Sequence, residues 1–76
     1  MPLINKVKQF CDRNGITPYR LHKQVGLSKR IAYELYNDAK KKPSINTIER
    51  ICDAYFCEVA DIIESVSWDE YLDLDE

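Results

Sequence analysis

Two adjacent cations, Lys29 and Arg30, directly follow the turn sequence VGLS at residues 25–28. At the exposed start of a helix, such side chains can reach O6 and N7 of guanine in the major groove of DNA. Ser28 and the free backbone N–H groups of the first helical turn can hold a phosphate. The pattern therefore predicts contact with double-stranded DNA, and an ordinary solvated helix face is the alternative.

A second group of cations, Lys40, Lys41 and Lys42, follows shortly after the same segment. Lysines beside a groove-reading helix bind phosphates, which fixes the register of a protein on DNA without reading its sequence. A loop kept soluble by its charges is the alternative for this run.

Other residue types that could do chemistry lack partners in the sequence. The single histidine, His22, has no cysteine at metal-ligand spacing, and we expect it to be a packing residue. Cys52 and Cys57 are five residues apart, which predicts different helix faces and a packing role rather than a metal site. With no nucleophile–base arrangement and no glycine-rich phosphate loop, we expect no enzyme, no cofactor and no metal.

The composition is that of one small globular domain. The 76 residues are 45% hydrophobic and 32% charged, and no apolar run is long enough to span a membrane. The N-terminal segment does not read as a signal peptide. Three cysteines form no paired framework, so we expect a reducing cytoplasm, with the protein on the nucleoid when bound to DNA.

The net charge of −2 conceals two halves of opposite sign. Residues 1–43 carry ten Lys and Arg against three carboxylates, which gives +7, and residues 44–76 carry one Arg against ten carboxylates, which gives −9. A basic half favours nucleic acid as a partner, although charge alone is a weak indication.

Hydrophobic spacing predicts an all-α fold, a compact five-helix domain followed by a short acidic helix or tail. The expected helices span residues 3–14, 18–25, about 28–37, 45–55, 59–66 and 68–73. Thr17, Ser28, Ser44 and Ser67 are the expected N-caps, and Gly15 and Gly26 the expected left-handed ends. We expect residues 1–66 to be a helix-turn-helix DNA-binding domain and residues 67–76 a separate tail.

The tail contains Trp68, Tyr71 and Leu72 among five carboxylates. Three roles are open: its aromatic rings complete the small core, it forms a self-association surface, or it binds another protein or shields the basic face. In each case its carboxylates lower non-specific affinity for DNA, because they repel phosphates.

The stretch ITPYRLHKQVGLSKRIAYELYNDAKKKPSINTIERICDAYFCEVADII (16–63) resembles the helix-turn-helix of Cro and phage-repressor-type (XRE-like) transcriptional regulators. The resemblance implies sequence-specific binding of duplex DNA, usually by a homodimer on a palindromic operator. Two departures stand out: His22 replaces a usual small residue, which implies a looser or repacked helix crossing, and Phe56 replaces a usual glycine.

The resemblance also implies roles for individual residues. By position, the base-contacting residues are Lys29, Arg30, Tyr33 and Glu34, and Glu34 would accept from N4 of cytosine. The expected phosphate contacts are Thr17, Arg20, Ser28, Asn37, Lys40, Lys41 and Lys42.

We therefore interpret the chain as a DNA-binding transcription regulator, a repressor or other occupancy-based factor, with the third helix in the major groove. The alternative is a protein-interaction module, such as an antitoxin or adaptor, that uses the acidic tail. A protein partner would then contact Trp68, Tyr71 and Leu72, and neither interpretation involves a membrane.

Overall fold

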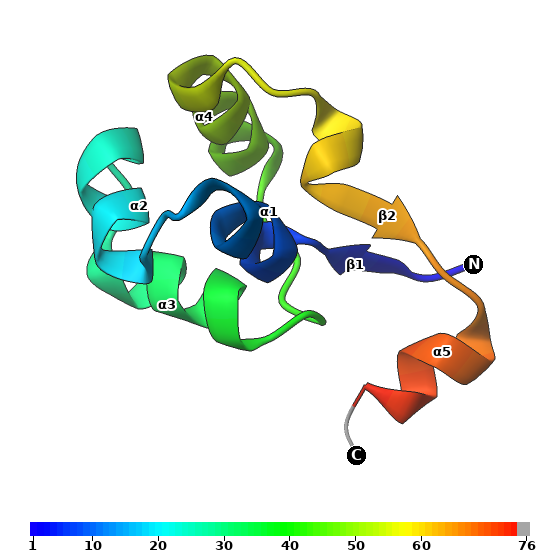
Figure 1. Ribbon diagram of the computed structural model, residues 1–76. Coiled ribbons are helices and arrows are strands. Elements are labelled where there is room, and N and C mark those ends of the chain that lie inside the picture. Colours follow the sequence, from blue (N-terminus) through cyan, green and yellow to red (C-terminus); the bar gives the residue numbers. More distant parts are fainter. Residues whose placement is uncertain (75–76) are drawn as a thin grey trace.

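The computed structural model describes residues 1–74, so Asp75 and Glu76 of the predicted tail lie outside it. The elements, in chain order, are β1 (Leu3–Asn5), α1 (Val7–Asn14), α2 (Pro18–Val25), α3 (Lys29–Asn37), α4 (Ile45–Tyr55), the 3-10 helix η1 (Val59–Asp61), β2 (Ile63–Ser65) and α5 (Trp68–Asp73). Figure 1 shows α1 at the centre, with α2 and α3 on one side, the two strands on the other, and α5 beyond the strands.

The four predicted N-caps are confirmed, because each accepts a local hydrogen bond. The side chains of Thr17, Ser28, Ser44 and Ser67 each accept from the backbone N–H three residues later, at 3.1–3.2 Å. The left-handed ends are confirmed too, with φ of 66° at Gly15 and 82° at Gly26.

The all-α prediction is wrong in two places, since the fold is mostly helical with a small antiparallel sheet. Residues 3–5 form β1 rather than the first turn of α1, and they pair with β2 in the register Leu3↔Ser65, Ile4↔Glu64. The predicted helix over 59–66 is instead η1 followed by β2. Short apolar runs fit either a helix or a strand, and pairing between distant segments decided for the strand.

The core is formed by one cluster of buried side chains at the centre of the helices. Its members are Val7, Phe10, Cys11, Ile16, Leu21, Leu27, Ala32, Leu35, Ile51 and Ile62. Trp68 does not complete this core as one interpretation of the tail proposed, because 61% of its surface is exposed, and Leu72 is 63% exposed.

Two kinds of feature are absent from the described part of the chain. Within residues 1–74, none of the helices has the length and apolar character needed to cross a membrane. The same residues contain no group of three or more His, Cys, Asp or Glu that could hold a metal ion.

Candidate nucleic-acid interface

The turn between α2 and α3 is closed by two side chains that bind its carbonyl groups. His22 forms a short hydrogen bond from Nδ1 to the Leu27 carbonyl, which requires the proton on Nδ1 because a carbonyl only accepts. Arg50 of α4 donates from Nη1 to the Gly26 carbonyl at 3.3 Å. His22 therefore does more than pack: together with Arg50, it binds the carbonyls of the turn that leads into α3.

The first residues of α3 project from the body of the protein. The Ser28 hydroxyl accepts from the Ile31 N–H at 3.2 Å, which leaves Lys29 and Arg30 as the first two helical residues. Lys29 is exposed, and the Arg30 side chain is 88% exposed. Tyr33, one turn later, is 40% exposed. The tip of α3 thus presents two cations and one aromatic ring to solvent.

Glu34 of α3 lies between cations from two elements. Its Oε1 accepts from Arg30 Nε at 2.8 Å, and its Oε2 lies 3.0 Å from Lys41 Nζ. The hydrogen bond from Arg30, with that from Lys41, holds the pKa of this carboxyl below its usual range. Both carboxylate oxygens are thus occupied, and Glu34 joins the tip of α3 to the loop that follows it.

Tyr19 of α2 belongs to the same face, and the sequence reasoning missed it. Its ring is 46% exposed and lies beneath two ammonium groups, with Lys23 Nζ 5.6 Å and Lys29 Nζ 5.7 Å from its centroid. The ring also lies 6.0 Å from the imidazole of His22. The spacing of Tyr19 and Lys23 by four residues on one helix was the available signal.

Asn5 of β1 anchors the loop of residues 38–42, which carries Lys40, Lys41 and Lys42 and which we call the lysine loop. This residue is 2% exposed, and its amide nitrogen donates to the carbonyls of Asp38 at 2.8 Å and Lys41 at 2.6 Å. Its Oδ1 accepts from the Val7 N–H at 3.2 Å, and its backbone N–H donates to Ala39. One buried side chain therefore ties the sheet, the start of α1 and the loop together.

Tyr71 of α5 covers the outer side of the lysine loop. Its ring centroid lies 4.5 Å from Lys40 Nζ and 5.4 Å from Lys42 Nζ, and Lys42 also donates to its hydroxyl at 3.4 Å. The loop thus presents its cations between the end of α3 and the acidic α5.

The remaining predicted phosphate contacts occupy different surroundings. The Thr17 hydroxyl accepts from the Arg20 N–H, and Asn37 is exposed at the end of α3. Arg20 donates from Nη1 to the Gly15 carbonyl at 3.2 Å and lines a hollow between α1 and α2. The structure brings together the tip of α3 and the lysine loop, and it places Arg20 beside that hollow.

The cysteines are packing residues, but one expectation about them is wrong. Cys57 follows the turn at Phe56, and its N–H donates to the Cys52 carbonyl at 3.3 Å. Burial raises the pKa of the Cys57 thiol to about 11, and the neighbouring Cys52 thiol adds to the rise. The two thiols are therefore neighbours rather than occupants of different faces, and the raised pKa keeps Cys57 protonated.

A protein-family model matches most of the chain. The model of the Cro/C1-type HTH DNA-binding domain matches residues 6–67, and so confirms the resemblance seen in the sequence. Searches of curated proteins and of solved structures returned no match.

Proposed function

The chain belongs to the Cro/C1-type helix-turn-helix DNA-binding family, and on that premise we propose that it is a sequence-specific transcriptional regulator with α3 in the major groove. The observation that carries the proposal is the exposed tip of α3, where Lys29 and Arg30 follow directly on the Ser28 cap. A major groove admits one helix, and cations at its N-terminal end are placed to bind guanine.

The contacts divide into two classes by their positions. We propose that Lys29, Arg30 and Tyr33 contact bases, and that Glu34 either accepts from a cytosine or holds Arg30 in place. Phosphates would be held by a second set: Thr17, Arg20, Ser28, Asn37, Lys40, Lys41 and Lys42. Arg20 stays in this set, since its one hydrogen bond to the Gly15 carbonyl leaves other guanidinium N–H groups able to donate to a phosphate. Tyr19 is added as a ring that orients Lys29.

We further propose that two copies act together on a palindromic operator, as is usual for this family, and repress or assist transcription by occupying it. The working site is then the cytoplasm, on the nucleoid. The interaction-module alternative is not favoured by the family match, and no catalytic role is proposed.

Selection of duplexes from a random pool, followed by binding measurements at rising salt, tests the proposal. We expect one enriched motif, and an affinity that falls steeply with salt because Lys and Arg displace counterions from phosphates. A pool without an enriched motif, bound equally at low and high salt, would refute it.

A further inference from the structure

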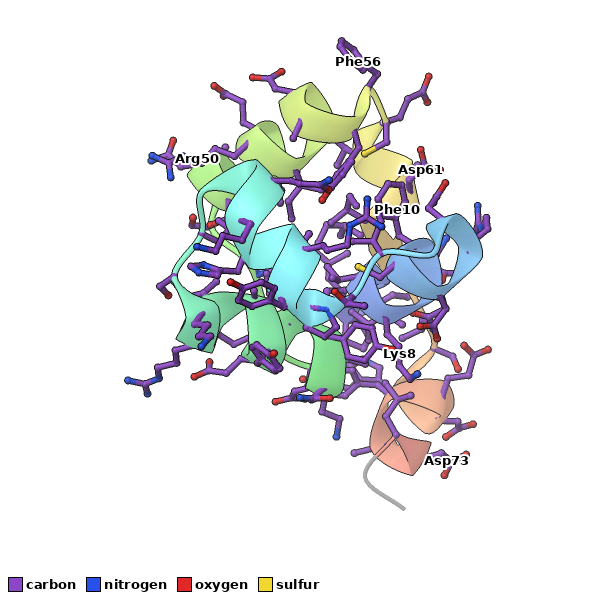
Figure 2. The ribbon with its side chains drawn as sticks, turned by 60° about the vertical axis from the view of Figure 1, so that its left-hand side comes forward. Lys8, Phe10, Arg50, Phe56, Asp61 and Asp73 are labelled. Carbon is purple, nitrogen blue, oxygen red and sulfur yellow. The ribbon has the colours of Figure 1, made fainter. Side chains whose placement is uncertain are left out.

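A hollow of about 570 Å³ lies beside Phe10 and Asp61, which Figure 2 shows toward the Phe56 end of the molecule. Its walls come from α1, α2 and the end of α4, and include the rings of Phe10 and Tyr55, whose centroids are 5.7 Å apart. The charged lining residues are Arg13, Arg20 and Asp61, and Asn14 and Gln24 add polar groups, so the hollow combines aromatic rings with polar side chains and a small positive balance. We call it the Phe56 groove, after the residue at its rim.

The backbone of Phe56 has an unfavourable conformation. Its backbone is left-handed, with φ 53° and ψ 42°, and it is the one non-glycine residue with positive φ among residues 1–74. Its side chain is 94% exposed, so the ring adds nothing to the core. Glycine would suit this conformation better, and a bulky residue in it is a true outlier. Strain and exposure at one position indicate that the ring serves a contact outside its own chain.

The helix α5 has the complementary surface. Trp68 and Leu72, four residues apart, are both more than half exposed, while Tyr71 faces the lysine loop. Asp69, Glu70 and Asp73 give this short helix a negative charge. An acidic helix with two apolar anchors matches an aromatic groove that holds two arginines.

A chain does not fill its own groove with α5, because the two lie far apart. Phe56 and Asp73 are at opposite ends of the molecule in Figure 2, and α4 and α5 are likewise apart in Figure 1. The chain measures 34 Å along its longest axis, and the Val66 N–H, bound to the Pro2 carbonyl at 3.0 Å, ties down the start of α5.

We propose that α5 of a second copy occupies the Phe56 groove. Trp68 and Leu72 pack against Phe56 and Tyr55, and the carboxylates of α5 face Arg13. Two copies in antiparallel orientation make this contact twice, which closes a symmetric dimer. This inference rests on the proposed function in one respect: it names the surface through which the two copies proposed to bind DNA would associate.

Association without DNA tests the inference on the full chain, by sedimentation velocity and by the fluorescence of Trp68, the single tryptophan. We expect a dimer that dissociates on dilution, with emission shifting to shorter wavelength as Trp68 is buried. Phe56→Gly and Trp68→Ser should each weaken the dimer at least about ten-fold. At dilutions where both proteins are monomeric, Phe56→Gly should melt no lower than wild type, so that a folding defect does not explain the loss.

Mixing the two variants distinguishes this contact from other dimers. Phe56→Gly retains an intact α5 and Trp68→Ser an intact groove, so an equimolar mixture should form a heterodimer although neither variant dimerises well alone. A mixture that stays monomeric, a monomeric wild type at high concentration, or variants that dimerise normally would each overturn the inference.

Binding of Phe56→Gly to a single half-site should be unchanged. Wild type that dimerises yet fails to bind DNA would refute the proposed function and leave this inference intact.

Discussion

At the level of single residues, Glu34 is the position where the base-reading and loop-ordering roles compete. Its two oxygens bind Arg30 at 2.8 Å and Lys41 at 3.0 Å. A carboxylate held in this way can orient Arg30 toward the groove, but it must release one cation before it accepts from a cytosine. The two roles have opposite consequences when the charge is removed.

We predict that Glu34→Gln raises affinity for all duplexes and steepens its dependence on salt. The substitution removes a negative charge from the interface and frees two cations for phosphates. Binding to the selected and to random duplexes across a salt series checks this. Loss of preference at one base pair, with no gain on random DNA, would instead assign Glu34 a base-reading role.

We predict that Arg30→Ala costs about 1–3 kcal/mol on the selected duplex and relaxes the preference at one base pair. Lys41→Ala should weaken binding to all sequences alike, because a phosphate contact carries no sequence information. Lys8→Ala is the matched control, since Lys8 forms a similar ion pair with Asp12 four residues on, but from α1. If Arg30→Ala and Lys41→Ala lower specific and random binding equally, the division of roles is wrong.

Phe56 allows a prediction about stability alone. At dilutions where the protein is monomeric, Phe56→Gly should raise the free energy of unfolding by about 1 kcal/mol, because it relieves a left-handed backbone without removing a side chain packed within the chain. Phe56→Ala removes the same ring but keeps the Cβ, and should show no such gain. Urea unfolding of the three proteins separates the outcomes, and equal stability of both variants would show that the backbone is unstrained.

At the level of elements, β1 positions the lysine loop, mainly through the hydrogen bonds that the Asn5 side chain donates to its carbonyls. We predict that Asn5→Ala destabilises the fold by about 1–3 kcal/mol, since it leaves the carbonyls of Asp38 and Lys41 without their donor. Amide hydrogen exchange should accelerate in the loop 38–42 before it does in α4. Asn46→Ala, at an exposed position on α4, is the control, and an equal effect there would contradict the anchoring role.

The same elements show which features could be predicted from the sequence. The starts of α2 and α3 were predictable because the hydroxyls of Thr17 and Ser28 accept from the backbone N–H three residues later, which is a local interaction. The strands were not, since β1 pairs with a segment some sixty residues away. Within the site, the exposure of Lys29 and Arg30 could be predicted because the Ser28 cap makes them the first two residues of α3. The contacts of Glu34 with Lys41 and of Tyr71 with the loop depend on tertiary positions that no local pattern encodes.

At the level of the whole molecule, the basic half is stabilised by its few carboxylates. Residues 1–43 contain only Asp12, Glu34 and Asp38 as acids, and two of these bind cations. Asp12 accepts from the Tyr36 hydroxyl at 2.7 Å and from Lys8 at 3.0 Å, so it joins α1 to α3. Glu34 joins α3 to the loop. Protonation of these two groups would leave the basic half as an almost uncompensated cluster of cations.

This arrangement predicts that acid destabilises the protein through Asp12 and Glu34. The hydrogen bond from Tyr36, then that from Lys8, lowers the pKa of Asp12, and contacts with Arg30 and Lys41 lower the pKa of Glu34. A carboxyl whose pKa is lower in the folded state adds stability above its unfolded pKa, and this is lost as the pH falls through the folded value. Stability should therefore fall below about pH 4, where free carboxyls titrate.

Urea unfolding at neutral and acidic pH measures this loss, and substitution assigns it to residues. The double variant Asp12→Asn, Glu34→Gln should be less stable than wild type at neutral pH but should lose less stability on acidification, because its amides do not titrate. The control, Glu49→Gln with Asp53→Asn, removes two exposed carboxylates from α4 and should keep the wild-type slope. If both double variants had the wild-type slope, the acid sensitivity would belong to the carboxylate-rich second half of the chain, and the contacts of Asp12 and Glu34 would not be its cause.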